Sequence, residues 1–298
     1  MRPIRTIRAV ITVAVTAGIL AACSTSPTPK PTPPPKPPAS YYLALGDSLS
    51  LGIQPNADGV DVETAQGYPD QLYATLRRTR PGLRLVRLGC SGETTKTMMN
   101  GGICPYPGGS QLAAATAFLR AHRGHVFLVT IDIGANDPQD CVQSKGIALI
   151  SDCITAMPEA AVNLGSILKA LRTAAGPGVR IVGMSYYLPE LAEWRKGIFG
   201  HVLARTSEEL AAGYSTLLTR VYAQAGDQVA NVFGAFGTSD FGSMESVPGV
   251  GTVPLNLAQL CDWTWECAAS PRGPNEHANA TGYAVIANAF LQVLDAKG

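Results

Sequence analysis

The chain is poor in charge and has almost no charge imbalance. Only 15% of its 298 residues are charged, and the formal net charge is +1. Nucleic-acid partners usually require a basic surface, so this composition argues against DNA or RNA binding. Glycine loops of the Walker or dinucleotide-binding type are also missing, and we therefore expect no nucleotide cofactor.

Metal-site patterns are equally scarce. The sequence has only four histidines, and none of its seven cysteines forms a CxxC pair. Such spacings are typical of zinc sites, so we expect no metal. No pair of carboxyl residues marks a glycosidase cleft either.

The N-terminus has the pattern of an export signal. Three arginines precede an apolar run over 9–22, which is too short to span a bilayer with ease. The run ends in Leu-Ala-Ala-Cys, and this resembles the bacterial lipoprotein box. The resemblance implies cleavage after residue 22 and a lipid on Cys23, although an ordinary secretory signal with an incidental cysteine is the alternative. We expect a signal peptide over 1–22 and a product anchored in the membrane of the cell envelope, on the extracytoplasmic side.

A proline-rich linker and one large domain follow. Residues 23–40 consist largely of Pro, Thr, Ser and Lys, a composition that favours an extended polyproline II tether. Hydrophobic residues make up 46% of the whole chain, enough for a substantial core in a domain over 41–298.

Six cysteines remain beyond Cys23, an even number that indicates disulfides in an oxidising compartment. Six cysteines permit 15 connectivities. Pairing of sequence neighbours is the simplest, and it predicts Cys90–Cys104, Cys141–Cys153 and Cys261–Cys267.

Apolar β-rich runs alternate with helical patterns along the domain. Strands are predicted over 41–45, 85–88, 126–133, 180–187 and 229–236, and helices over 68–79, 110–122, 158–174, 203–225 and 281–295. This alternation predicts a three-layer α/β/α sandwich with a doubly wound, flavodoxin-like parallel sheet. We expect the helix over 203–225 to be core and 237–261 to be a long loop.

Short polar motifs stand where the first three strands end. Gly46-Asp47-Ser48 follows the first strand, Gly89-Cys90-Ser91-Gly92 the second, and Gly134-Ala135-Asn136 the third. Carboxyl ends of parallel strands share one edge of a sheet, where ligands bind. Each motif alone also suits a structural role, because Ser48 and Asn136 are helix-capping residue types and Gly92 suits a turn.

Taken in order, these motifs and a late histidine resemble the SGNH (GDSL-like) hydrolase family, from Tyr41 to the last helix. The resemblance implies that Ser48 is the nucleophile. It also implies an oxyanion hole built from the Ser48 and Gly92 N–H groups and the Asn136 side-chain amide. Such fixed donors stabilise the charge that develops in acyl transfer.

Four histidines compete for the role of base. His122 and His125 flank the start of the third strand, at the opposite edge of the sheet, and His201 adjoins an irregular region. His277 stands just before the last helix, where the resemblance implies the base.

The chain departs from the family pattern at the acidic residue that orients the histidine. The family usually has Asp-x-x-His, but Pro274 stands three residues before the histidine. Three options remain for the group that orients the imidazole: the backbone carbonyl of Pro274, the adjacent Glu276, or an acid of the predicted Cys261–Cys267 loop, either Asp262 or Glu266.

The resemblance therefore implies a serine esterase or lipase that acts on an acyl lipid or an acylated glycan through an acyl-serine intermediate. A cell-envelope acyltransferase and a catalytically weakened binding protein on the same fold are the alternatives. We expect a monomer. Seven side chains are candidates for an acyl pocket: Met98, Met99, Tyr106, Trp194, Phe199, Trp263 and Trp265.

Overall fold

A computed structural model describes residues 12, 14, 39–138 and 155–296. Residues Pro37–Gly298 form one unit, and the fold below belongs to that unit. Cys23 and the Cys141–Cys153 pair lie outside the described residues, so their predictions stay untested. Within the described ranges, no helix has both the length and the apolar character needed to cross a bilayer.

Five parallel strands form the central sheet, in the order β4-β1-β5-β6-β7. Their bounds are β1 Ser40–Gly46, β4 Leu83–Arg87, β5 Val126–Asp132, β6 Arg180–Met184 and β7 Gln228–Ala230. β4, the second strand of this sheet in chain order, lies at one edge beside β1. β5, β6 and β7 follow in order on the other side of β1. This is the doubly wound order of flavodoxin-like folds, so the predicted fold class is confirmed.

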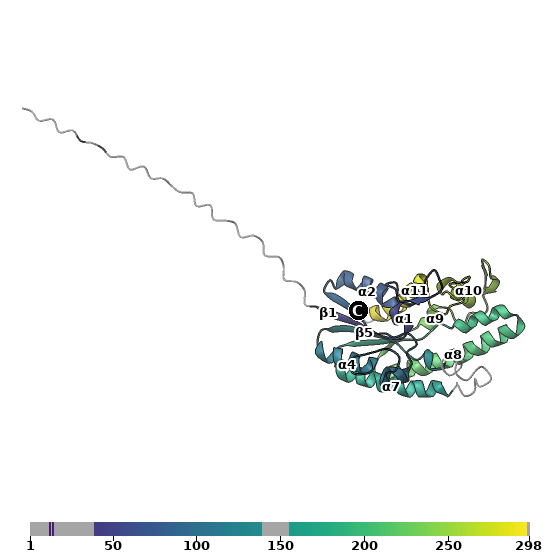
Figure 1. Cartoon of the computed structure of the whole chain (residues 1–298), viewed down its shortest axis with the longest axis horizontal. Coiled ribbons are helices and arrows are strands. Elements are labelled where there is room, and N and C mark those ends of the chain that lie inside the picture. Colours follow the sequence, from purple (N-terminus) through teal and green to yellow (C-terminus); the bar gives the residue numbers. More distant parts are fainter. Residues whose placement is uncertain (1–11, 13, 15–38, 139–154, 297–298) are drawn as a thin grey trace, which may run out of the picture. The chain divides into compact units, whose positions relative to one another are not determined.

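Alternate side chains of each strand enter two different cores, as the period of two in a strand requires. Tyr42 and Ala44 of β1 belong to one buried cluster, and Leu43 and Leu45 belong to the other. Helices α2 (Tyr68–Thr79) and α11 (Ala280–Asp295) cover the first face, whereas α4 (Gln111–Ala121) and α7 (Ala156–Ala175) cover the second (Figure 1). The sheet is therefore apolar on both faces, as its near-continuous apolar strands predict.

Side-chain caps explain where several helices begin. The Ser110 hydroxyl accepts a hydrogen bond from the Ala113 N–H at the start of α4, and the Asn279 side chain caps α11 in the same way. Thr94 and Thr97 form a capping box at α3 (Thr95–Asn100). Such caps satisfy N–H groups that the first turn leaves unpaired.

Two predictions for the C-terminal half need correction. The strand predicted over 229–236 ends at Ala230, because the Asn231 side chain accepts the Gly234 N–H and starts the short helix α9 (Val232–Ala235). The stretch over 237–261 is not one long loop. It contains the hairpin of β8 (Met244–Val247) and β9 (Gly251–Pro254), followed by α10 (Leu255–Trp263).

Three smaller elements matter for the site. A hairpin of β2 (Gln54–Pro55) and β3 (Asp61–Val62) extends from the first strand–helix connection. The 3₁₀ helix η2 (Pro189–Lys196) leads into the 27-residue helix α8 (Ile198–Gln224). The disulfides Cys90–Cys104 and Cys261–Cys267 are both present, which confirms these two predicted pairs.

Candidate active site

Ser48 begins a one-turn helix, α1 (Ser48–Leu51), directly after β1. The buried Asp47 caps this turn, since its Oδ1 accepts the Leu49 N–H at 2.9 Å. Gly46 makes the sharp turn possible: its φ is +128°, and a Cβ atom there would lie 2.0 Å from the Asp132 carbonyl oxygen. Only glycine fits this position, so the half-buried Ser48 is held at the carboxyl edge of the sheet.

A second buried acid supports the turn from behind. Asp132, the last residue of β5, accepts hydrogen bonds from the Ser50 N–H at 3.1 Å and the Tyr68 hydroxyl at 2.5 Å. Burial, together with the nearby charge of Asp47, raises the pKa of Asp132 well above its usual range. Burial likewise raises the pKa of Asp47 to about 6. The two carboxyl groups thus hold protons more tightly than exposed ones, which lessens their repulsion beneath the nucleophile.

A side-chain amide joins the turns that follow β4 and β5. Gly92 has a φ of +77°, and a Cβ atom placed on it would meet no atom within 4 Å. The Asn136 side-chain nitrogen donates to the Glu93 carbonyl oxygen at 2.9 Å, which ties the turn after β5 to the turn after β4. This bond uses one of the two amide hydrogens of Asn136. The other hydrogen is the one that an oxyanion could accept.

Buried Gln111 holds these turns in register, a role that nothing in the sequence pattern indicated. Its side-chain oxygen accepts the Gly46 N–H at 2.7 Å, and its nitrogen donates to the Gly46 carbonyl at 2.9 Å and to Glu93 at 2.9 Å. One amide therefore links β1, α4 and the glycine turn. Tyr106, a predicted pocket residue, also serves the scaffold, because its hydroxyl donates to the Leu88 carbonyl at 2.6 Å.

His277 lies in the loop before α11 and is 8% exposed. The Trp265 N–H donates to the His277 carbonyl at 3.0 Å, and residues Thr264 and Ala278 form an antiparallel bridge. The Cys261–Cys267 disulfide closes the facing segment of the chain. Backbone pairing thus places the histidine next to a cross-linked loop.

Asn275, a residue that the sequence prediction did not include, contacts the imidazole. His277 Nδ1 lies 2.9 Å from the side-chain oxygen of Asn275. The backbone carbonyls of two predicted groups have other partners: that of Glu276 accepts the Tyr187 hydroxyl, and that of Asp262 accepts the Asn279 amide. Asp61 of the β2–β3 hairpin is the nearest carboxylate described, with Oδ2 3.5 Å from Nδ1.

Burial lowers the pKa of His277 below its usual value, while the charges of Asp61 and Glu276 oppose that change. A histidine that stays neutral near pH 7 is suited to accept a proton.

Ser48, Asn136 and His277 line one cavity of about 350 Å³. The predicted donor Gly92 is next to Glu93, whose carbonyl holds Asn136, but it is not among the lining residues. The structure therefore brings three of the four predicted site residues around one space and leaves the fourth adjacent to it.

One wall of this cavity is formed by helix α8, whose residues 203–225 were predicted to be core. One face of α8 supplies Leu203, Ser207, Leu210, Ala211, Tyr214, Ser215 and Leu218. The seven methionine and aromatic side chains predicted for an acyl pocket do not line it; Met98, for example, is fully buried in the core, and Trp194 stacks on His201.

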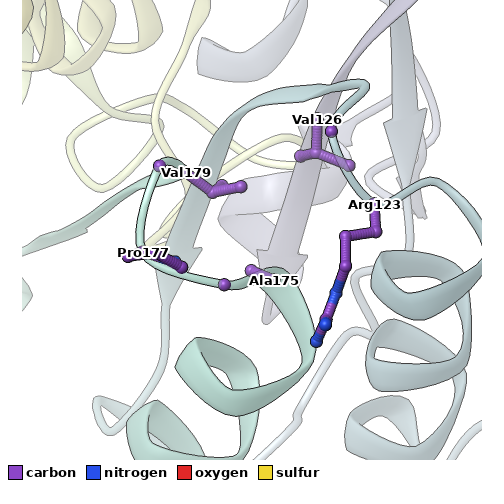
Figure 2. Close-up of a pocket in the computed structure, with 8 residues that line it drawn as sticks. Arg123, Val126, Ala175, Pro177 and Val179 are labelled. Carbon is purple, nitrogen blue, oxygen red and sulfur yellow. The ribbon is translucent and has the colours of Figure 1, made fainter.

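A second cavity of about 340 Å³ lies at the opposite edge of the sheet (Figure 2). It is bounded by the starts of β5 and β6 and by the end of α7, where Val126, Ala175 and Val179 are found. The Arg123 guanidinium at its side donates to the carbonyls of Thr173 and Ala174, the last turn of α7. Arg123 therefore has a structural role at a helix C-terminus.

A serine in a tight turn after the first strand of a doubly wound sheet shares one cavity with a buried histidine and an amide donor, an arrangement suited to the hydrolysis of esters. The comparisons with known proteins agree with this interpretation. The chain belongs to the GDSL-like lipase/acylhydrolase family, whose sequence model matches residues 44–285. It is accordingly a carboxylic ester hydrolase. No curated protein matches the chain in sequence.

Several solved structures are similar in fold. A lipase from a goat rumen metagenome is 14% identical, with a TM-score of 0.55 over 85% of this chain and 97% of that one. An extracellular lipase from Streptomyces rimosus is 19% identical, with a TM-score of 0.52 over 87% and 99%. A phospholipase A1 from Streptomyces albidoflavus is 20% identical, with a TM-score of 0.51 over 88% and 100%. At these identities the likeness establishes the shared fold.

Proposed function

We propose that the protein is a serine esterase in which Ser48 attacks the ester and His277 is the base. The observation that carries this proposal is the single cavity shared by Ser48, Asn136 and His277. His277 takes the hydroxyl proton as the Ser48 oxygen bonds to the carbonyl carbon. The negative charge that develops on the carbonyl oxygen is stabilised by the Asn136 amide and the Ser48 and Gly92 N–H groups.

The tetrahedral intermediate then collapses. The bond to the alcohol oxygen breaks, and His277 returns its proton to that oxygen, which leaves an acyl group on Ser48. Water enters, gives a proton to His277 and attacks the acyl carbon. The carboxylic acid departs and the Ser48 hydroxyl is restored.

The cavity supports a neutral fatty-acyl ester as the substrate class. Its walls carry leucines from α8, which suit an acyl chain. Four of its lining residues are carboxyl residues, namely Asp47, Glu190, Glu193 and Glu276, and none of the described lining residues is Lys or Arg. An anionic phosphate would be repelled by such a surface, so an acylglycerol or an acylated sugar fits better than an anionic phospholipid.

Exposed apolar side chains at the start of α8 support an ester delivered from a lipid phase. Leu203 lines the cavity, and the first two turns of α8 expose Ile198 by 76%, Phe199 by 82% and Val202 by 62%. Apolar patches of this kind mark contact surfaces in soluble domains. A lipid-presented acyl chain would pass along this face into the cavity.

We further propose export and attachment to the extracytoplasmic face of the cell membrane through a lipid on Cys23, with the catalytic domain as a monomer. The apolar run over 9–22 and the position of Cys23 at its end support this part of the proposal. More than one acyl chain on such a cysteine gives stable anchoring.

Hydrolysis of p-nitrophenyl esters from acetyl to dodecanoyl by the mature protein tests the function. We expect turnover by the wild type, with kcat lower by at least about 10³ in Ser48→Ala and in His277→Ala. Turnover that survives Ser48→Ala would refute the mechanism. An inactive wild type would favour the binding protein, and acyl esters formed with added alcohols would favour the transferase.

A further inference from the structure

The orientation of Asn275 is determined by two partners of opposite kind. Its side-chain oxygen accepts the backbone N–H of His277 at 3.0 Å, and its nitrogen donates to Asp61 Oδ1 at 2.9 Å. A backbone N–H can only donate and a carboxylate can only accept, so the amide cannot be reversed. The oxygen of Asn275 therefore faces Nδ1 of the histidine.

This orientation sets the tautomer of the base. An amide oxygen is only an acceptor, so Nδ1 of His277, 2.9 Å away, must carry a proton. Nε2 is then the nitrogen without a proton, the form that a general base needs. An orienting aspartate performs this task in Ser-His-Asp triads, and here an asparagine makes the contact.

Asparagine lacks the negative charge that stabilises an imidazolium, and the adjacent hairpin provides one. Asp61 Oδ2 lies 3.5 Å from His277 Nδ1, and the Asp61 side chain is 43% exposed. Its charge raises the pKa of His277 against the effect of burial. The other acidic groups around the histidine are the neighbouring Glu276 and, across the cavity, Asp47, Glu190 and Glu193.

The hairpin is built to approach this loop closely. Gly59, at its tip, has a φ of +79°, and a Cβ atom there would lie 2.1 Å from the Pro271 carbonyl oxygen. At its base, Gln54 accepts the Trp265 indole N–H at 3.3 Å. These two contacts hold Asp61 against the loop that contains Asn275. The two residues are 214 positions apart in the sequence.

We propose that Asp61 is the positioning carboxylate of the base, and that it acts on His277 through the Asn275 amide. The pair replaces the aspartate missing at the family's usual position. This inference rests on the proposed serine mechanism. Asp61 touches neither the substrate nor the reacting atoms, so its effect must be seen in the behaviour of the histidine.

The test compares Asp61→Asn with Asp58→Asn, a matched loss of one carboxylate at the exposed tip of the same hairpin. Asp61→Asn should lower kcat by about 10- to 100-fold with little change in KM, less than the ~10⁴ loss for an aspartate bonded directly to the imidazole. Removal of the negative charge should also lower the pKa of His277, so the acid limb of the kcat/KM profile should move to lower pH. Asp58→Asn should change neither.

A double variant provides a rescue. Asn275→Asp in the Asp61→Asn background bonds a carboxylate directly to Nδ1 and should recover activity to near the wild-type level. An unchanged pH profile in Asp61→Asn, an equal shift in Asp58→Asn, or a double variant as slow as the single one would each overturn the inference. Loss of activity in Ser48→Ala, measured alongside, keeps the serine mechanism separate, because only retained activity there would overturn the mechanism itself.

Discussion

Filling the cavity beside α8 should change which esters the enzyme prefers without removing its chemistry. Ala211 lines the cavity and is only partly buried, so a phenyl ring at this position would project into the space left for the acyl chain. Each buried methylene contributes about 0.8 kcal/mol, or roughly fourfold in kcat/KM when that burial is realised in the transition state. If the ring displaces the chain from three methylene positions, the loss is about 2.4 kcal/mol, or roughly 60-fold.

The assay is kcat/KM for p-nitrophenyl acetate and octanoate in the wild type and Ala211→Phe. The octanoate-to-acetate ratio should fall by about 60-fold while acetate turnover remains close to that of the wild type. Ala223→Phe is the matched control, because Ala223 lies on the same helix but is exposed and does not line the cavity. Ser215→Leu, one turn further along α8, is a milder second filling. A uniform loss for both esters, or an unchanged ratio in both cavity variants, would refute the assignment of this cavity to the acyl chain.

Two further predictions concern the groups around the nucleophile. Asn136→Ala should lower kcat by about 10²- to 10³-fold, the usual loss for one oxyanion donor, with KM nearly unchanged in steady-state assays; a loss below threefold would exclude Asn136 from the oxyanion hole. Asp47 and Asp132 have pKa values raised by burial, that of Asp47 from 3.8 to about 6, so the native state binds more protons than the unfolded chain in this interval. The contribution of Asp47 to stability is therefore complete below about pH 4 and is lost as the pH rises through about 6, and that of Asp132 is lost in the same direction. Urea midpoints measured at pH 4.5 and 7 should show this fall, and it should be smaller in Asp132→Asn; an equal fall in both proteins would contradict the assignment.

The sheet and the position of Ser48 at its carboxyl edge were predictable because both follow from local patterns. The first four residues of β5, 126–129, are all apolar, which a strand covered on both faces tolerates, and the residues after such strands must meet at one edge. The strand over 229–236 was predicted too long since Val232 and Phe233 have strand-like side chains. The cap that Asn231 provides outweighs that preference.

The wall of the cavity and the partner of the base were not predictable, for two different reasons. Apolar residues at helical spacing look the same whether they face a core or a cavity, so Leu210 and Leu218 of α8 gave no separate signal. Asp61 lies in a short hairpin whose position depends on tertiary contacts with Pro271 and Trp265, and no local rule connects it with His277.

Helix α8 is longer than the sheet it covers. Tyr214 donates to the Gly134 carbonyl, directly beyond β5, so the turns from Leu203 to Tyr214 rise about 16 Å past the carboxyl edge at 1.5 Å per residue. One added or deleted turn in that overhang would change the depth of the cavity by about 5 Å and leave every strand in place. Under the proposed function, substrate range and catalytic chemistry are thus encoded in separable parts of the chain, which lets one diverge under selection while the other is retained.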